Sequence, residues 1–169
     1  MELNLKLNFK EELENRISDY ILFKDFLKYH LLVFDSENND RRNIFYEVIK
    51  QYNWIKYDSD IHDYDDHFDY VLFNDANFDK IGLYDIFFKF NGKTIIFDNE
   101  TLLTKQSLIN ILEYAVCSSP DSCSKWPIRL EGKKEFIFNG SVIILTNQDK
   151  AKFCKIKKYE YLIRDMIKL

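Results

Sequence analysis

The sequence has very few of the residues that shape tight turns. Among 169 residues there are four glycines and two prolines, and no glycine precedes Gly82. Three cysteines occur without a C-x-x-C pair, which argues against a disulfide framework and favours a reducing compartment. No apolar run approaches the roughly 20 residues of a membrane span, and the start, MELNLKLNFKEELEN, matches neither a signal peptide nor a transit peptide. We therefore expect a cytoplasmic protein that does not contact membranes.

Apolar and charged residues are abundant, and the charges are unevenly distributed. Apolar residues make up 46% of the chain and aromatic residues 17%, which argues against a disordered protein and suffices for one buried core. The net charge of −4 gives no general attraction to nucleic acid. Residues 58–79 nevertheless carry eight Asp and no Lys or Arg, whereas residues 150–169 carry seven basic residues against Glu160 and Asp165.

Short apolar runs alternate with amphipathic stretches, which predicts an α/β layered fold with a mostly parallel sheet flanked by helices. Asn8 and Glu11 have the spacing of a capping box at the start of the first helix. Asn139-Gly140 has the form of a hairpin turn between strands 135–138 and 141–146. We expect one domain without a lid, composed of an N-terminal helix 1–29, a P-loop-like core 30–149 that includes the acidic segment 58–79, and a basic C-terminal helix 150–169.

The first predicted strand leads into a loop and a helix, residues 31–49, in the layout of a phosphate-binding loop. In the pattern G-x-x-x-x-G-K-[ST] the glycines let backbone N–H groups surround phosphates, the lysine reaches the terminal phosphates and the hydroxyl binds Mg²⁺. In this chain the specified positions hold Asp35, Asp40, Arg41 and Arg42. Two carboxylates replace the glycines and the hydroxyl is missing, so we expect that the loop does not bind nucleotide in the usual way.

Polar residues stand at the ends of two later strands. Asp98 ends the apolar run TIIFD, and Asn147 follows the run VIILT. An acid at the carboxyl end of a parallel strand lies in the crevice where such sheets bind ligands. The residue after Asp98 is Asn99, which cannot act as a base, and we expect Glu100 to face away. Ordinary turn residues explain the same pattern, and this interpretation stays open.

The stretch 91–147, NGKTIIFDNETLL…INILEYAV…FIFNGSVIILTNQ, resembles the Walker B to sensor 1 core of AAA+ ATPases encoded by phages and plasmids. The resemblance implies a degenerate member of that family, of viral or mobile-element origin, in the host cytoplasm. It makes Asp98 the acid that holds Mg²⁺ and Asn147 the sensor, which lies between the Walker elements. We expect both on adjacent parallel strands that flank strand 31–34. If ATP and Mg²⁺ bind, Arg41, Asp98 and Asn147 are the residues that hold them, with Asp98 on the metal.

These features favour a non-catalytic P-loop-like protein without a cofactor, which acts by binding a protein or nucleoprotein partner. Two alternatives stay open: an active Mg²⁺-dependent NTPase in which Arg41 replaces the lysine, and an acidic inhibitor that mimics nucleic acid. The basic residues 150–169 are a candidate for direct contact with nucleic acid, although a packed amphipathic helix explains them too, and oligomerisation stays open. The expected partner-binding residues are Asp58, Asp60, Asp63, Asp65, Asp66 and Asp69.

Overall fold

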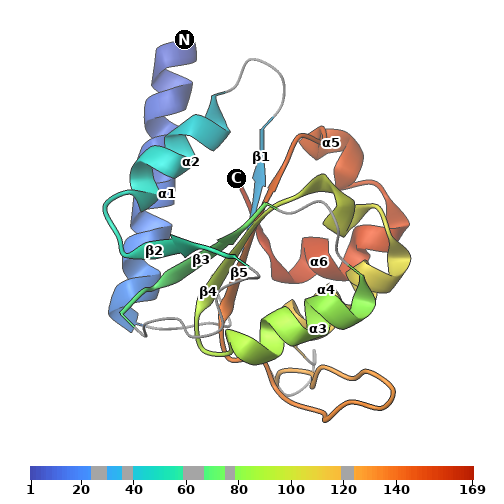
Figure 1. The fold of residues 1–169 in the computed structure, drawn as a ribbon. Coiled ribbons are helices and arrows are strands. Elements are labelled where there is room, and N and C mark those ends of the chain that lie inside the picture. The colour runs from blue at the N-terminus through green and yellow to red at the C-terminus, as the bar shows by residue number, and fades with distance from the viewer. Residues whose placement is uncertain (24–29, 36–39, 59–66, 75–78, 119–123) are drawn as a thin grey trace.

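The computed structural model describes residues 1–23, 30–35, 40–58, 67–74, 79–118 and 124–169, and Figure 1 shows their arrangement. In chain order the elements are α1 (Glu2–Phe23), β1 (Leu31–Phe34), α2 (Arg41–Ile49), β2 (Trp54–Lys56), β3 (Tyr70–Phe73), α3 (Lys80–Lys89), β4 (Thr94–Asp98), the 3-10 helix η1 (Glu100–Leu103), α4 (Gln106–Val116), β5 (Ser141–Thr146), α5 (Lys150–Phe153), the 3-10 helix η2 (Lys157–Tyr159), α6 (Glu160–Asp165) and β6 (Ile167–Lys168).

The strands form one six-stranded sheet in the order β2-β3-β4-β5-β1-β6. Every neighbouring pair in the sheet is parallel, which confirms the predicted α/β layered fold. Among the described residues, none of the helices combines the length and the apolar character that a membrane span requires.

Each face of the sheet carries its own apolar core. Helices α1 and α2 cover one face, and α3, α4 and α6 cover the other (Figure 1). Every residue of β1 and β5 is buried, because helices lie on both sides. Their sequences, LLVF and SVIILT, are accordingly apolar without the alternation of a half-exposed strand.

The first helix begins earlier than the capping box predicts. Helix α1 starts at Glu2, so Asn8 lies inside the helix and the predicted cap is wrong. The segment ELNLKL consists mostly of good helix formers, and it extends the helix beyond the part that Phe9, Leu13 and Ile17 anchor in the core. The predicted end near Tyr29 lies outside the described residues.

The predicted hairpin at Asn139-Gly140 is also wrong, because residues 135–138 form no strand. The segment is anchored instead to the turn before β4: Asn91 donates its side-chain amide to the Ile137 carbonyl at 3.0 Å and accepts the Asn139 N–H at 2.7 Å. Glycine is required at 140 because a Cβ there would lie 2.2 Å from the Lys93 carbonyl oxygen. The dipeptide therefore serves a close backbone approach and not a hairpin.

The prediction of one C-terminal helix over residues 150–169 is wrong. The segment forms α5, η2, α6 and the short strand β6. Phe153 and Tyr159 are both buried and stack with ring centroids 4.0 Å apart. Six residues apart, the two rings would point in different directions from a continuous helix, so the chain turns between them. Strand β6 then pairs with β1 and becomes the outermost strand of the sheet.

Candidate functional site

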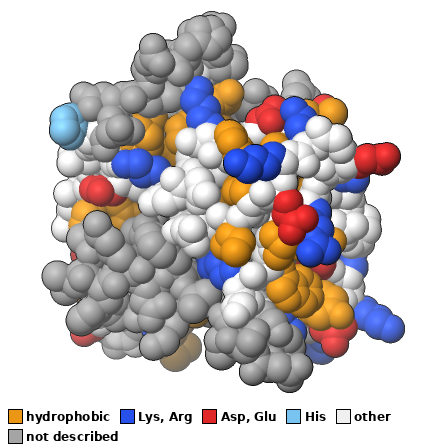
Figure 2. Space-filling view, turned by 90° about the horizontal axis from the view of Figure 1, so that it is seen from below, with side chains coloured by type: hydrophobic (Ala, Val, Ile, Leu, Met, Phe, Trp, Pro, Cys, Tyr) orange, Lys and Arg blue, Asp and Glu red, His pale blue; other side chains and the backbone are white. Residues whose placement is uncertain are grey.

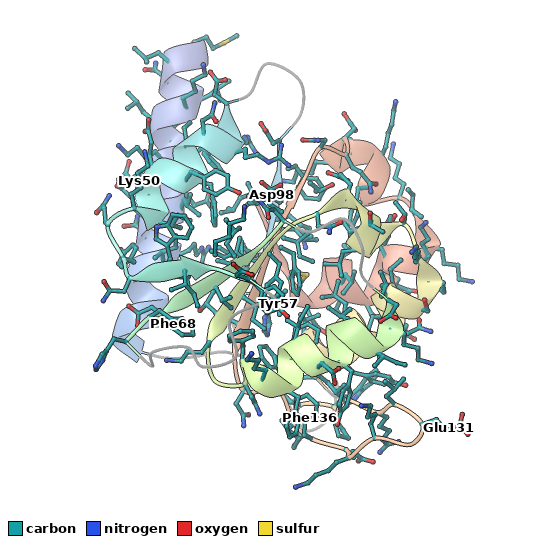
Figure 3. All side chains as sticks on the ribbon, in the orientation of Figure 1. Lys50, Tyr57, Phe68, Asp98, Glu131 and Phe136 are labelled. Atoms are coloured by element: carbon teal, nitrogen blue, oxygen red, sulfur yellow. The ribbon has the colours of Figure 1, made fainter. Side chains whose placement is uncertain are left out.

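Three polar side chains meet at the carboxyl end of the sheet. Asp35 follows β1, Asn147 follows β5 and Asp98 ends β4, and β5 pairs with both other strands in parallel. The prediction that Asp98 and Asn147 belong to adjacent parallel strands is confirmed. The prediction that both strands flank β1 is wrong, because β5 lies between β4 and β1. Asn147 thus lies between the strand ends that carry Asp35 and Asp98, and Figure 3 labels Asp98 at this edge.

The guanidinium of Arg42, the second residue of α2, links all three strand ends. Its Nε donates to Asp98 Oδ1 at 3.1 Å, and its Nη1 donates to Asp35 Oδ2 at 3.1 Å and to Asn147 Oδ1 at 2.6 Å. Side-chain exposure is 23% for Arg42, 17% for Asp35 and 21% for Asp98. Charge-assisted hydrogen bonds that are so largely withdrawn from water are stronger than those of a surface ion pair.

Tyr46 lies one helical turn after Arg42 and binds the other oxygen of Asp98. Its hydroxyl donates to Asp98 Oδ2 at 2.6 Å. Burial, followed by this hydrogen bond to the carboxylate, raises the pKa of Tyr46 well above its usual value, so the phenol stays protonated and remains a donor. Each oxygen of Asp98 therefore already accepts a hydrogen bond from α2.

The two residues after Asp98 are both engaged within the fold. Asn99 is buried, and its Oδ1 accepts the Thr101 N–H at 2.8 Å, which caps η1. The prediction that Glu100 faces away is wrong. Its carboxylate accepts the Asn147 N–H and, at 3.2 Å, the Thr146 hydroxyl. These bonds attach the start of η1 to the end of β5. The Glu100 carboxylate thus already accepts two hydrogen bonds, from Thr146 and Asn147.

The start of α2 is arranged around a carboxylate. The backbone N–H of Arg41 donates to Asp35 Oδ1 at 3.2 Å. This is one of the helix-start N–H groups that remain available for an anion when no side chain caps them. Asp40 adopts a left-handed conformation, with φ of 48°, and its carboxylate accepts from Lys6 of α1 at 2.8 Å. Residues 36–39 lie outside the described part of the chain.

The two adjacent arginines differ in what they contact. The Arg41 guanidinium lies over the Phe9 ring of α1, 4.9 Å from its centroid, whereas Arg42 contacts Asp98 and Asn147. Of the three predicted cofactor-binding residues, the structure thus brings Asp98 and Asn147 together but not Arg41. It adds Arg42, which the phosphate-loop pattern assigns to the position of the Ser or Thr that binds Mg²⁺. The spacing of Arg42 and Tyr46 puts both on one side of α2, and this is the signal that identifies the pair.

The acidic segment is only partly described. Asp58 and Asp69 are exposed, whereas Asp60, Asp63, Asp65 and Asp66 lie outside the described residues. Within the described ranges, no group of three or more His, Cys, Asp or Glu side chains is arranged to hold a metal ion.

A scan against the models of known protein families finds no match for this chain, and no curated protein matches it. The class that its own structure defines is an α/β domain with an all-parallel sheet and a charged side-chain network at the carboxyl end of that sheet.

Proposed function

We propose that this chain is a non-catalytic P-loop-like protein that acts by binding a protein or nucleoprotein partner. The observation that supports the proposal is the position of Arg42. Its guanidinium lies between Asp35, Asp98 and Asn147, where the resemblance to AAA+ ATPases would place Mg²⁺ against the Walker B acid. We propose that the guanidinium of Arg42 takes the place that Mg²⁺ would occupy.

The replacement removes the chemistry of a metal site while keeping its charge. A guanidinium is always protonated and neutralises carboxylates, but it offers no coordination position for a phosphate oxygen or a water. A metal ion would have to displace Arg42 from Asp98, and the Tyr46 hydroxyl occupies the other oxygen. A triphosphate entering beside the loop would also have to compete with the carboxylates of Asp35 and Asp40 for the cations that these already bind, Arg42 and Lys6.

Calorimetry with Mg-ATP tests the absence of nucleotide binding. We expect no saturable heat at a protein concentration able to detect roughly millimolar binding. The control is Asp98→Ala titrated under the same conditions. Saturable binding by the natural chain that disappears in the control contradicts the proposal and supports an active Mg²⁺-dependent NTPase, the alternative that the adjacent positions of Asp98 and Asn147 favour.

Neutralising the acidic segment tests the binding role. Charges at the rim of an interface steer encounter and set specificity, and the Asp residues from 58 to 69 have no Lys or Arg between them. The variant changes six residues to Asn: Asp58, Asp60, Asp63, Asp65, Asp66 and Asp69. We expect unchanged folding, weaker capture of the proteins or nucleoproteins that the natural chain captures from cell extract, and a smaller loss of capture as salt rises. Equal capture by both versions would remove the acidic segment from the interface.

A further inference from the structure

Five exposed lysines lie within nine residues of the chain, in the segment 150–158 that begins at the same end of the sheet as the charged site. Figure 1 shows α5 at the same end of the sheet as the end of β1, because α5 follows the carboxyl end of β5 after three residues. All five side chains are exposed. We call this group the lysine surface; its members are Lys150, Lys152, Lys155, Lys157 and Lys158.

The backbone beneath the lysine surface is held firmly. Phe153 and Tyr159 are buried and stacked, and the Tyr159 hydroxyl donates to the Leu103 carbonyl at 2.7 Å. Asp149 caps α5 by accepting the Lys152 N–H at 2.9 Å. The lysines are therefore carried on a fixed backbone, so binding through them loses little conformational entropy beyond that of their own side chains.

The lysine surface lacks carboxylate partners. Among the residues that the structure describes, none of its five members forms an ion pair, although Lys6, Arg42 and Lys133 elsewhere each do. The Lys150 ammonium donates to a backbone carbonyl, that of Lys168, which leaves its charge uncompensated. Figure 2 shows a different surface from below, where described basic and acidic side chains lie interspersed. A protein with a net charge of −4 thus concentrates five positive charges in nine residues of its chain.

We propose that the lysine surface binds the phosphate backbone of a nucleic acid without reading its sequence. This names the partner class within the proposed binding role and rests on it. Ammonium groups suit phosphates as point charges. The two aromatic residues of the segment, Phe153 and Tyr159, are buried, so neither can stack on a base. Ile156 is the one exposed large apolar side chain between residues 150 and 158, and a lone aliphatic side chain is not the cluster of Trp, Tyr or Arg anchors that centres a protein interface.

The proposal fixes the dependence of affinity on salt. Five phosphate contacts on duplex DNA give a slope of log affinity against log salt of about −4.5. Affinity therefore falls by roughly 500-fold between 50 mM and 200 mM salt.

The test is fluorescence anisotropy with a labelled duplex DNA of random sequence, in the absence of nucleotide. The surface variant is K150Q/K152Q/K155Q/K157Q/K158Q. The matched control changes five exposed lysines of other elements and alters the net charge equally: K80Q/K89Q/K105Q/K133Q/K134Q. Thermal unfolding establishes that both variants fold.

We expect the natural chain to bind with a slope between −4 and −5, the surface variant to lose at least 100-fold in affinity at 50 mM salt, and the control to lose less than about 10-fold. Absence of binding by the natural chain at 50 mM salt overturns the proposal, and so do equal losses in both variants. Competition by polyglutamate as strong as by unlabelled DNA also overturns it, in favour of an acidic protein surface. None of these outcomes involves Arg42 or nucleotide, so the calorimetric test of the proposed function stands separately.

Discussion

The two ends of the same parallel sheet both withdraw ionisable side chains from water, but they treat charge in opposite ways. At the carboxyl end, Arg42 is placed between the carboxylates of Asp35 and Asp98. At the amino end, His30 is fully buried directly before β1, and its Nδ1 accepts the Val142 N–H at 3.0 Å.

The charge of Lys125 acts on His30, and among the described residues no acid contributes to the pKa shift of either group. Burial, followed by the charge of Lys125, holds the pKa of His30 well below its usual value. Burial also lowers the pKa of Lys125 to about 8, although its ammonium donates to the Phe138 carbonyl at 3.0 Å. Opposite charges are paired by hydrogen bonds at the carboxyl end of the sheet, whereas at the amino end burial favours the neutral forms of His30 and Lys125.

The greatest loss of stability is expected from a change at the carboxyl end of the sheet, the charged end, where Arg42 pairs with Asp35 and Asp98. Arg42→Met should lower the free energy of unfolding by about 3 kcal/mol, because it leaves two largely buried carboxylates without their cation. Urea unfolding at neutral pH measures the change. The matched control is the neighbouring residue: Arg41→Met removes only the contact with Phe9 and should cost below about 1 kcal/mol. Equal losses in the two variants would mean that Arg42 is no more important than a surface arginine.

A smaller effect is expected from the second donor to Asp98. Tyr46→Phe removes a hydrogen bond to a charged acceptor and should cost about 1.5–2 kcal/mol in the same unfolding experiment. Tyr52→Phe, in the turn after α2, is the control, because no hydrogen bond of its hydroxyl is seen among the described residues. It should change stability by less than about 0.5 kcal/mol. A Tyr46→Phe variant as stable as the natural chain would show that Asp98 does not depend on this donor.

The smallest change in stability is expected at the amino end of the sheet, the neutral end, where burial of His30 makes the free energy of unfolding depend on pH. Below the unfolded-state pKa of about 6.5, the unfolded chain takes up a proton at His30 that the folded chain does not, so stability falls as pH falls. Between pH 7.5 and pH 5.5 this residue should account for about 1.4 kcal/mol of lost stability. His30→Asn retains an acceptor for Val142 and should remove that part of the slope. A His30→Asn variant with the natural slope would contradict this explanation.

The sequence predicts the charged end better than the neutral one, for a physical reason. Buried parallel strands are continuous apolar runs, so β1, β4 and β5 are recognisable, and the acid or amide that ends each run marks the carboxyl edge. His30 directly precedes such a run and looks like one more strand residue. Nothing in the sequence indicates that Lys125, 95 positions later, is the charge that acts on it.

Arg42 shows where motif spacing stops being informative. Laying the phosphate-loop pattern over the chain assigns Arg41 to the position of the lysine, but the direction of each arginine depends on how α2 begins. That beginning depends on the left-handed backbone at Asp40, an uncommon conformation for a residue other than glycine. The prediction of one C-terminal helix fails for a related reason. The stacking of Phe153 on Tyr159 overrides the helical periodicity of the residues around it.

Arg42 lies beside Asp98 as an internal cation, and a double-mutant cycle measures the energy of that pairing. Unfolding free energies are measured for the natural chain, Arg42→Met, Asp98→Asn and the double variant. We expect a coupling energy of at least about 1.5 kcal/mol, because each single variant removes the same charge-assisted contact. Single effects that add to within about 0.5 kcal/mol would show that the two residues do not interact, and would contradict this expectation.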